Sequence, residues 1–229
     1  MNFYDLLTQR TKTFGNKTFL RVDDETFSYE DFLSAVDENF SDGGKFVSQA
    51  VNFFAAQKSG KIPVLLHDGS TKLFGGDGTN CVGVLTSGST SAPKFLFRTF
   101  ASWANFFSTQ NEIFRVDAAT KLFMHGSLSF TGNLNAFLAT LDAGGSIVTS
   151  EKFAPKTWLE LLRDATNIYL VPTKLVLLAT GKPQGNIRAI FTGSQVLSAA
   201  QSLSLMKKLP VAELILYYGA TELNYVTYK

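Results

Sequence analysis

Hydroxyl side chains and a glycine precede a lysine in one short segment, Thr86-Ser87-Gly88-Ser89-Thr90-Ser91-Ala92-Pro93-Lys94. An apolar run at 81–85 leads into it and predicts a buried strand, so the hydroxyls should lie in the loop at that strand's carboxyl end. Backbone N–H groups and hydroxyls there can bind phosphate oxygens, and Lys94 adds a positive charge. This chemistry suits a polyphosphate. Because Pro93 precedes Lys94 and Phe95 follows it, the segment is not a nucleoside-triphosphate P-loop; the alternative is a polar surface loop with a solvated lysine.

Other segments favour the phosphate interpretation. Residues 86–94 resemble the T-S-G-[ST]-T-G-x-P-K-G loop of the adenylate-forming superfamily, which includes acyl-CoA synthetases, aryl-CoA ligases, luciferases and peptide synthetase adenylation domains. The run Tyr217-Tyr218-Gly219-Ala220-Thr221-Glu222 resembles that family's Y-G-x-T-E motif, and residues 187–197 resemble its adenine-closing segment. Residues 26–32 and 53–64 resemble the early T-Y-x-E-L and F-x-A-A-x-K-A-G elements. These segments occur in the family's order across nearly the whole chain.

The resemblance implies an enzyme that uses ATP and Mg²⁺ to convert a carboxylic acid into an acyl-adenylate, for transfer to CoA or to a carrier-protein phosphopantetheine. The implied catalytic residues are Lys94, His125, Thr221 and Glu222, and Glu222 would also help to hold Mg²⁺. The implied nucleotide-binding residues are Thr86, Ser87, Gly88, Ser89, Thr90, Lys94, Gly193, Ser194, Gln195, Tyr218, Gly219, Ala220 and Thr221. Thr221 would contact the α-phosphate, and Tyr218 would stack on adenine. The alternatives are a solvated carboxylate at Glu222 and a core aromatic at Tyr218.

His125 follows the apolar run 122–124, where the family has a residue that lines its carboxylate pocket. A structural histidine is the alternative, and His67 receives no role. Amino-acid-activating domains usually carry an acidic residue just after this point, because a buried ammonium group needs a carboxylate. Residues 125–132 contain no acid, so we expect a fatty or aryl acid as the substrate.

Composition limits the class of protein. With 229 residues, of which 45% are hydrophobic and 17% charged, the chain can bury a substantial core in one or two domains. A net charge of +2 gives no electrostatic case for a nucleic acid or membrane surface as partner. The single cysteine, Cys81, excludes an internal disulfide and favours a cytoplasmic location. Neither a leader peptide nor a membrane-spanning run is recognisable.

Periodicity predicts an α/β fold. Short strands are expected at 62–66, 81–85, 121–124, 146–149, 168–171, 188–191 and 214–217. Helices are expected at 99–114, 134–141, 158–162, 175–179 and 199–209. This alternation predicts a mainly parallel sheet with helices on both faces, and places all three implied nucleotide-binding segments at one sheet edge. The chain is interpreted as one partial adenylate-forming core over 1–229, with a small amino-terminal subdomain at 1–80 as an option. Residues 68–80 are the softest connection.

The chain also departs from the family pattern. Ser91 and Phe95 replace glycines, so a backbone turn that needs positive φ there would be strained by about 1 kcal/mol or more. The amino-terminal part is compressed, and residues 1–229 have no counterpart of the family's carboxyl-terminal domain with its catalytic lysine. Two functions therefore stay open. One is an adenylate-forming ligase, as a fragment or as half of a split enzyme, and the other is a degenerate member that binds a nucleotide, an acyl chain or a partner without turnover.

Overall fold

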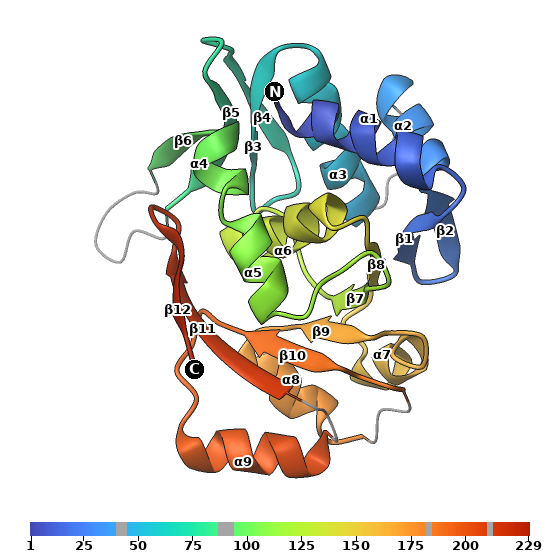
Figure 1. Cartoon of the computed structure of the whole chain (residues 1–229), viewed down its shortest axis with the longest axis vertical. Helices are drawn as coiled ribbons and strands as arrows, with labels where there is room; N and C mark the ends of the chain where they lie inside the picture. Colours follow the sequence, from blue (N-terminus) through green and yellow to red (C-terminus); the bar gives the residue numbers. More distant parts are fainter. Residues whose placement is uncertain (40–44, 87–93, 182–184, 210–212) are drawn as a thin grey trace.

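The computed structural model describes residues 1–39, 45–86, 94–181, 185–209 and 213–229. Its helices are α1 (Phe3–Phe14), α2 (Tyr29–Asp37), α3 (Lys45–Lys58), α4 (Phe100–Ala104), α5 (Phe107–Ile113), α6 (Thr131–Asp142), α7 (Pro155–Leu161), α8 (Pro172–Leu178) and α9 (Ala199–Lys208). Its strands are β1 (Thr18–Val22), β2 (Glu25–Ser28), β3 (Lys61–Leu65), β4 (Thr71–Gly75), β5 (Asn80–Leu85), β6 (Phe95–Thr99), β7 (Lys121–Met124), β8 (Ser146–Thr149), β9 (Asn167–Tyr169), β10 (Ala189–Thr192), β11 (Glu213–Ala220) and β12 (Asn224–Tyr228). Figure 1 shows their arrangement.

The larger sheet has the strand order β12-β11-β10-β9-β7-β8-β1-β2 over the described residues. Neighbouring strands from β1 to β11 run parallel, and β2 and β12 add antiparallel edges. Alternate residues of its strands enter different cores: Leu122 and Met124 face the core that includes α6, whereas Phe123 packs with α7 and α8. Helices therefore cover both faces (Figure 1), which confirms the predicted mainly parallel α/β fold.

The smaller sheet, with strand order β4-β3-β5-β6, was not anticipated as a separate unit. The expected strands at 62–66 and 81–85 form, as β3 and β5, but they pair with each other here and do not join the larger sheet. The spacing of apolar residues shows that a strand is buried, but it does not show which other strand it pairs with. As a result, the segment after β5 leaves a different sheet from the segments after β10 and β11.

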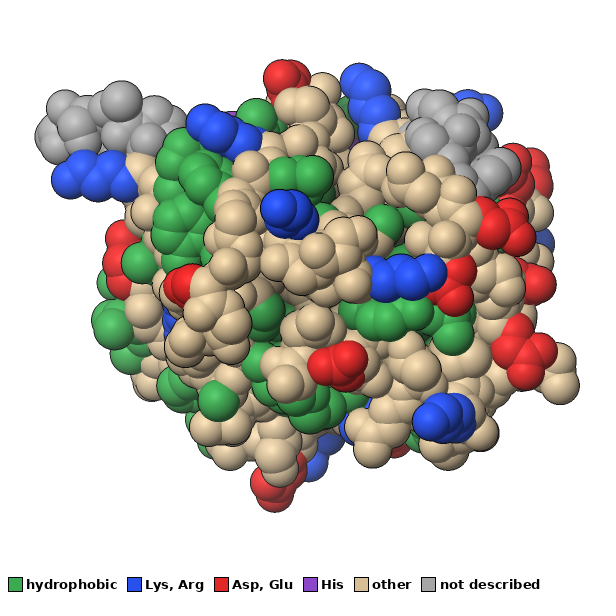
Figure 2. All heavy atoms as spheres, turned by 90° about the horizontal axis from the view of Figure 1, so that it is seen from above, with side chains coloured by type: hydrophobic (Ala, Val, Ile, Leu, Met, Phe, Trp, Pro, Cys, Tyr) green, Lys and Arg blue, Asp and Glu red, His purple; other side chains and the backbone are tan. Residues whose placement is uncertain are grey.

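One face of the smaller sheet carries exposed aromatic side chains. Phe95 and Phe97 on β6 are 39% and 37% exposed, and both contact Phe74 of β4, with ring centroids 5.1 and 4.9 Å apart. The ammonium of Lys72 lies over the rings of Phe74 and Phe95. Figure 2, which views the molecule from above, shows hydrophobic side chains gathered beside side chains of Lys or Arg. The intervening residues Leu96 and Arg98 are less exposed, as expected for alternation along a strand.

Local differences from the predicted elements have local causes. The helix expected at 99–114 is two helices, α4 and α5, although Thr99 does cap the first by accepting a hydrogen bond from the Ser102 N–H. The connection expected at 68–80 contains β4, which forms a hairpin with β3. The T-Y-x-E-L-like segment forms β2 and the start of α2, where Ser28 and Asp31 make a capping box. No helix in the described ranges combines the length and the apolar character that crossing a bilayer requires.

Candidate functional site

The predicted phosphate loop connects two antiparallel strands, β5 and β6, as the loop of a hairpin. Its two described ends face each other: the Thr86 N–H donates to the Lys94 carbonyl at 3.0 Å, and the Lys94 N–H donates to Thr86 Oγ1 at 3.4 Å. Ser87, Gly88, Ser89 and Thr90 lie outside the described residues, as does Ser91. The Lys94 side chain is exposed at the base of the loop.

Phe95 does not have the positive φ that would strain a residue in place of glycine. It begins β6, pairs with Leu85 of β5, and is absent from the residues with positive φ. The backbone here is extended, so a side chain is tolerated and packs on Phe74. The backbone at position 95 therefore does not require a glycine.

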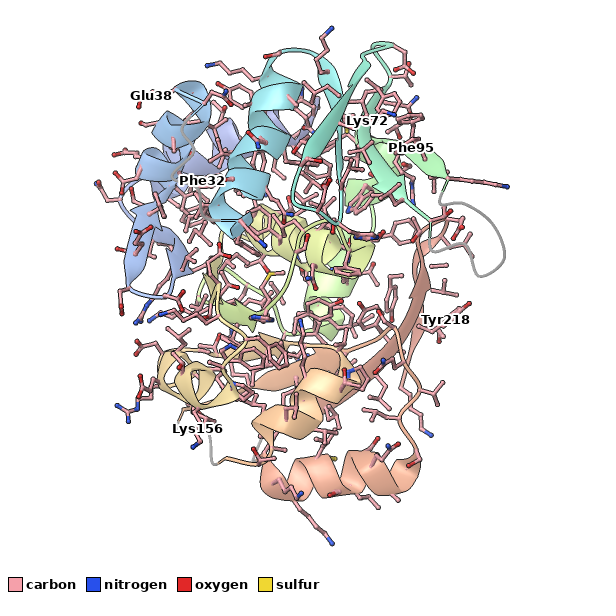
Figure 3. The ribbon with its side chains drawn as sticks, turned by 180° about the vertical axis from the view of Figure 1, so that it is seen from behind. Phe32, Glu38, Lys72, Phe95, Lys156 and Tyr218 are labelled. Carbon is pink, nitrogen blue, oxygen red and sulfur yellow. The ribbon has the colours of Figure 1, made fainter. Side chains whose placement is uncertain are left out.

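The Y-G-x-T-E-like motif lies at the β11–β12 hairpin. Tyr218, Gly219 and Ala220 belong to β11 and pair with β12, and Thr221 and Glu222 form the turn that follows. The Tyr218 side chain is 62% exposed, so the alternative of a core aromatic is wrong; Figure 3 shows this side chain at the surface. The Glu222 side chain is exposed and that of Thr221 is half-buried.

A guanidinium group joins this turn to the smaller sheet. Arg98 of β6 donates from Nη1 to the Thr221 carbonyl at 3.2 Å, across a sequence separation of 123 residues. The tip of the β11–β12 hairpin consequently lies beside β6 (Figure 1). The expectation that all three segments leave one sheet edge is thus wrong in detail. A side-chain contact between the two sheets brings the Lys94 strand and the Thr221 turn together.

A further contact places Thr221 near the start of α6. Its hydroxyl oxygen lies 3.3 Å from that of Thr131, the first residue of α6. Next to it, the hydroxyl of Tyr217 donates to that of Tyr169 at 3.1 Å. Burial raises the pKa of both phenols, so they stay protonated near neutral pH.

The third predicted segment follows β10. Gly193 is buried, and a Cβ built on it would lie 2.6 Å from Cζ of Tyr217. Close packing against this ring explains a glycine here. Ser194 has a φ of 70°, and both Ser194 and Gln195 are exposed. This turn therefore packs, through Gly193, against Tyr217 of β11, the strand that carries the Y-G-x-T-E-like motif.

His125 follows β7, as predicted, and is held by Lys174 of α8. The Lys174 ammonium lies 3.0 Å from Nδ1 of His125 and 2.8 Å from its carbonyl oxygen. The His125 ring also packs against Trp158, with centroids 4.4 Å apart. Burial, and secondly the charge of Lys174, lower the pKa of His125 from 6.5 to about 4. The imidazole is therefore neutral at pH 7, and its Nδ1 accepts from Lys174.

Both histidines of the chain line one pocket of about 160 Å³. Nδ1 of His67 lies 2.9 Å from the Ser129 hydroxyl, and the His67 ring stacks on Phe130. The pocket also contains Asp68 and Glu151, which come from other segments than 125–132. Each carboxylate accepts a backbone hydrogen bond: Asp68 from Ser70 and Glu151 from Phe46. The sequence argument from residues 125–132 did not see these two acids.

Comparisons with known proteins bear on this arrangement. A family model described as AMP-binding enzyme matches residues 77–229. The chain belongs to this family. The uncharacterised acyl-CoA ligase YhfT of Bacillus subtilis (strain 168) is 32% identical over 150 residues, which are 63% of this chain and 31% of that protein. The putative long chain fatty acid-CoA ligase VraA of Staphylococcus epidermidis is 29% identical over 148 residues, 63% of this chain and 32% of that protein. The chain spans about a third of the length of these curated relatives.

Solved structures share the fold of this AMP-binding family member. VinN has a TM-score of 0.78 at 16% identity, covering 100% of this chain and 77% of VinN. ATP-bound MatB from Rhodopseudomonas palustris also has a TM-score of 0.78, at 19% identity, covering 100% of this chain and 62% of MatB. The inhibitor-bound N-terminal domain of FACL13 from Mycobacterium tuberculosis has a TM-score of 0.77 at 13% identity, covering 96% and 76% of the two chains. These values show the fold of this family's amino-terminal portion.

The residues present fit Mg²⁺ only together with phosphate. The described ranges hold no group of three or more histidine, cysteine, aspartate or glutamate side chains that could chelate a metal by themselves. Mg²⁺ commonly binds one or two carboxylates and completes its shell with water and substrate phosphates. An exposed carboxylate at Glu222, next to the Thr221 hydroxyl and joined through Arg98 to the Lys94 strand, suits that mode.

Sequence reasoning missed Arg98, Thr131 and Lys174. Arg98 follows Phe95 and Phe97 at the alternate position of the strand, so the sequence could have indicated a cation on the face opposite to the two aromatic rings. Thr131 and Lys174 carry no local signal, because their importance lies in contacts with residues 90 and 49 positions away.

Proposed function

We propose that this AMP-binding family member takes part in the ATP-dependent activation of a carboxylic acid to its acyl-adenylate, for transfer to the thiol of CoA or of a carrier-protein phosphopantetheine. The observation that carries the proposal is the hydrogen bond from Arg98 to Thr221. It brings the strand that begins beside Lys94 to the turn that carries Thr221 and Glu222. A phosphate-binding lysine, a hydroxyl and a carboxylate then serve one nucleotide.

The residues have separate tasks in this proposal. Lys94 and the N–H groups of the β5–β6 loop bind the terminal phosphates, which leave as pyrophosphate when the acid attacks the α-phosphate. The Thr221 hydroxyl donates to an α-phosphate oxygen, and the Glu222 carboxylate holds Mg²⁺, which when bound offsets the negative charge of the phosphates. Gly193, Ser194 and Gln195 close over the adenine, and exposed Tyr218 offers a ring for stacking.

His125 is proposed to face the acid. It is neutral, so the imidazole itself adds no positive charge that would hold the acid as a salt. A fatty or aryl acid fits better than an amino acid, because Asp68 and Glu151 already accept hydrogen bonds from the backbone.

Calorimetric titration with ATP and Mg²⁺ tests the proposal. The wild type should bind, and Lys94→Ala should bind about ten- to a hundredfold more weakly, because one charge-assisted phosphate contact is lost. Lys156→Ala is the matched control, since Lys156 is exposed on α7, well away from Phe95 and Tyr218 in Figure 3. Equal affinities for the wild type and Lys94→Ala would contradict the role of Lys94.

A second candidate is a module that binds nucleotide without turnover. It is favoured by the pairing of Tyr218 and Gly219 with β12, which engages part of the motif's backbone in a hairpin. It predicts ATP binding without ATP–pyrophosphate exchange at any acid concentration. Exchange that depends on an added acid favours the ligase.

A further inference from the structure

Arg98 links the two sheets at the proposed nucleotide site. Its Nη1 donates to the Thr221 carbonyl at 3.2 Å, and its Nη2 donates to the Ser102 carbonyl at 2.6 Å. Its Nε also donates to the Ser102 hydroxyl at 3.2 Å. The guanidinium lies 5.6 Å from the ring centroid of Trp103, which is fully buried. One planar group on the smaller sheet thus contacts both the β11–β12 turn of the larger sheet and helix α4.

We propose that Arg98 is a positioning residue that fixes the Thr221–Glu222 turn against the phosphate-binding strand. The inference rests on the proposed function, in which the turn and the strand form the two halves of the nucleotide site. Arg98 bonds the carbonyl of Thr221, whereas the Thr221 hydroxyl contacts the Thr131 hydroxyl and can still bond a ligand through its other positions.

The position of Arg98 on β6 supports this role. Lys94 precedes it by four residues on the same chain segment, and the strand between them is paired throughout with β5. A movement of Arg98 relative to Lys94 would therefore break the smaller sheet. Through Arg98, the turn has a fixed distance from the base of the loop.

The chemistry of the side chain also matters. Arg98 is half-buried, and burial lowers its pKa from the ordinary value, although a guanidinium remains charged at any physiological pH. Its fork donates to two carbonyl groups in different directions at once, which the point charge of a lysine does not reproduce with the same geometry. A guanidinium also stacks on an aromatic face better than an ammonium does.

Arg98→Met and Arg98→Lys test the proposal, with Arg115→Met as the matched control. Arg115 also binds β11, through two contacts to Glu213 of 3.2 and 3.0 Å, but at the opposite end of that strand from Thr221. We expect Arg98→Met to bind ATP about tenfold more weakly or worse, with Arg98→Lys between it and the wild type. Arg115→Met should stay within about twofold of the wild type.

Two readouts separate positioning from general stability. In a double-mutant cycle with Thr221→Ala, the losses of ATP affinity should not multiply, because Arg98 acts through the Thr221 turn. Hydrogen exchange at the Leu223 amide, which donates to the Ala220 carbonyl at 3.1 Å within that turn, should accelerate in Arg98→Met but not in Arg115→Met. Urea unfolding of all variants identifies any general loss of stability.

The outcomes are distinct. Unchanged ATP affinity and unchanged Leu223 exchange in Arg98→Met would overturn the inference, and so would multiplicative losses in the cycle or equal effects in Arg115→Met. If the wild type does not bind ATP but Leu223 exchange still responds selectively to Arg98→Met, the proposed function fails and the positioning of the turn stands. Selective loss of both affinity and protection supports both.

Discussion

The ammonium group of Lys174 lies 3.0 Å from Nδ1 of His125 and 2.8 Å from the His125 carbonyl oxygen. Two acceptors of one residue therefore share one cation. Burial lowers the pKa of Lys174, and the charged neighbour in turn contributes to the lowered pKa of His125. The pair connects α8 to the carboxyl end of β7 and sets which imidazole nitrogen faces away from Lys174.

The stability of the protein should depend on the titration of His125. Its pKa is about 4 in the folded state and 6.5 without the protein environment, so the unfolded chain binds the extra proton between these values. The free energy of unfolding therefore has its full value above pH 6.5. It falls as the pH drops from 6.5 toward 4, because the unfolded chain gains a proton that the folded protein does not. Because the ring is partly exposed, we expect a loss of about 1–2 kcal/mol, less than the full shift would give. Urea unfolding of wild type and His125→Gln at several pH values isolates it, because the other titrating groups cancel in the difference.

Lys174→Met gives a direct check of the cause. Removing the ammonium should raise the pKa of His125 above the wild-type value, but not to 6.5, because burial is the larger cause. The histidine ring signals in an NMR titration report this value. A wild-type pKa near 6.5, or an unchanged pKa in Lys174→Met, would contradict the geometry.

Gly193→Ala should destabilise the protein through a steric clash. The new Cβ would lie 2.6 to 2.9 Å from three ring atoms of Tyr217, a partly buried side chain whose hydroxyl is bonded to Tyr169. We expect a loss of about 1–3 kcal/mol in the free energy of unfolding, typical of overpacking. Gly75→Ala is the control, because a Cβ there meets no atom within 4 Å. Similar urea midpoints for the two variants would show that Tyr217 moves aside without cost.

Features with a local sequence pattern were predictable, and features that depend on residues far apart in the chain were not. The strands predicted at 121–124 and 146–149 match β7 and β8 because short apolar runs buried on both faces have a strong local pattern. The division into two sheets was not predictable, since β3 would show the same pattern in either sheet. The same holds for the site: its motifs were found individually, but the contact between Arg98 and Thr221 joins residues 123 positions apart. No local periodicity contains such a contact.

Apolar carboxylic acids should stabilise the protein more than amino acids do. Residues 125–132 contribute no acid, and the carboxylates of Asp68 and Glu151 in the pocket are engaged by backbone N–H groups. An unpaired buried ammonium costs several kcal/mol, whereas each buried methylene contributes about 0.8 kcal/mol. Thermal-shift measurements with a series of medium-chain and aryl acids, each compared with the amino acid of similar size, check this. Stabilisation by the amino acids alone would show that Asp68 or Glu151 exchanges its partner for the ligand.

The isolated 229-residue chain should form acyl-adenylate slowly and should not complete a thioester. In the family it resembles, a lysine of the carboxyl-terminal domain reaches the carboxylate and the α-phosphate, and this chain spans about a third of the curated relatives. Lys229 does not replace that lysine. Its backbone pairs with Leu216 in both directions, at 2.7 and 2.9 Å, which places it at the opposite end of the β11–β12 hairpin from Thr221. Five strand residues separate the two ends, roughly 16 Å at the usual rise.

One positioned charge is commonly worth about 2.7–4 kcal/mol in the transition state, so adenylation by residues 1–229 should run at least about a hundredfold below a complete family enzyme. Acid-dependent ATP–pyrophosphate exchange measures the first step, and chromatography of the CoA thioester measures the second. Thr221→Ala is the control for the first step, and it should remove the remaining exchange. Thioester formation at the rate of a complete enzyme would show that residues 1–229 supply every group that the reaction needs.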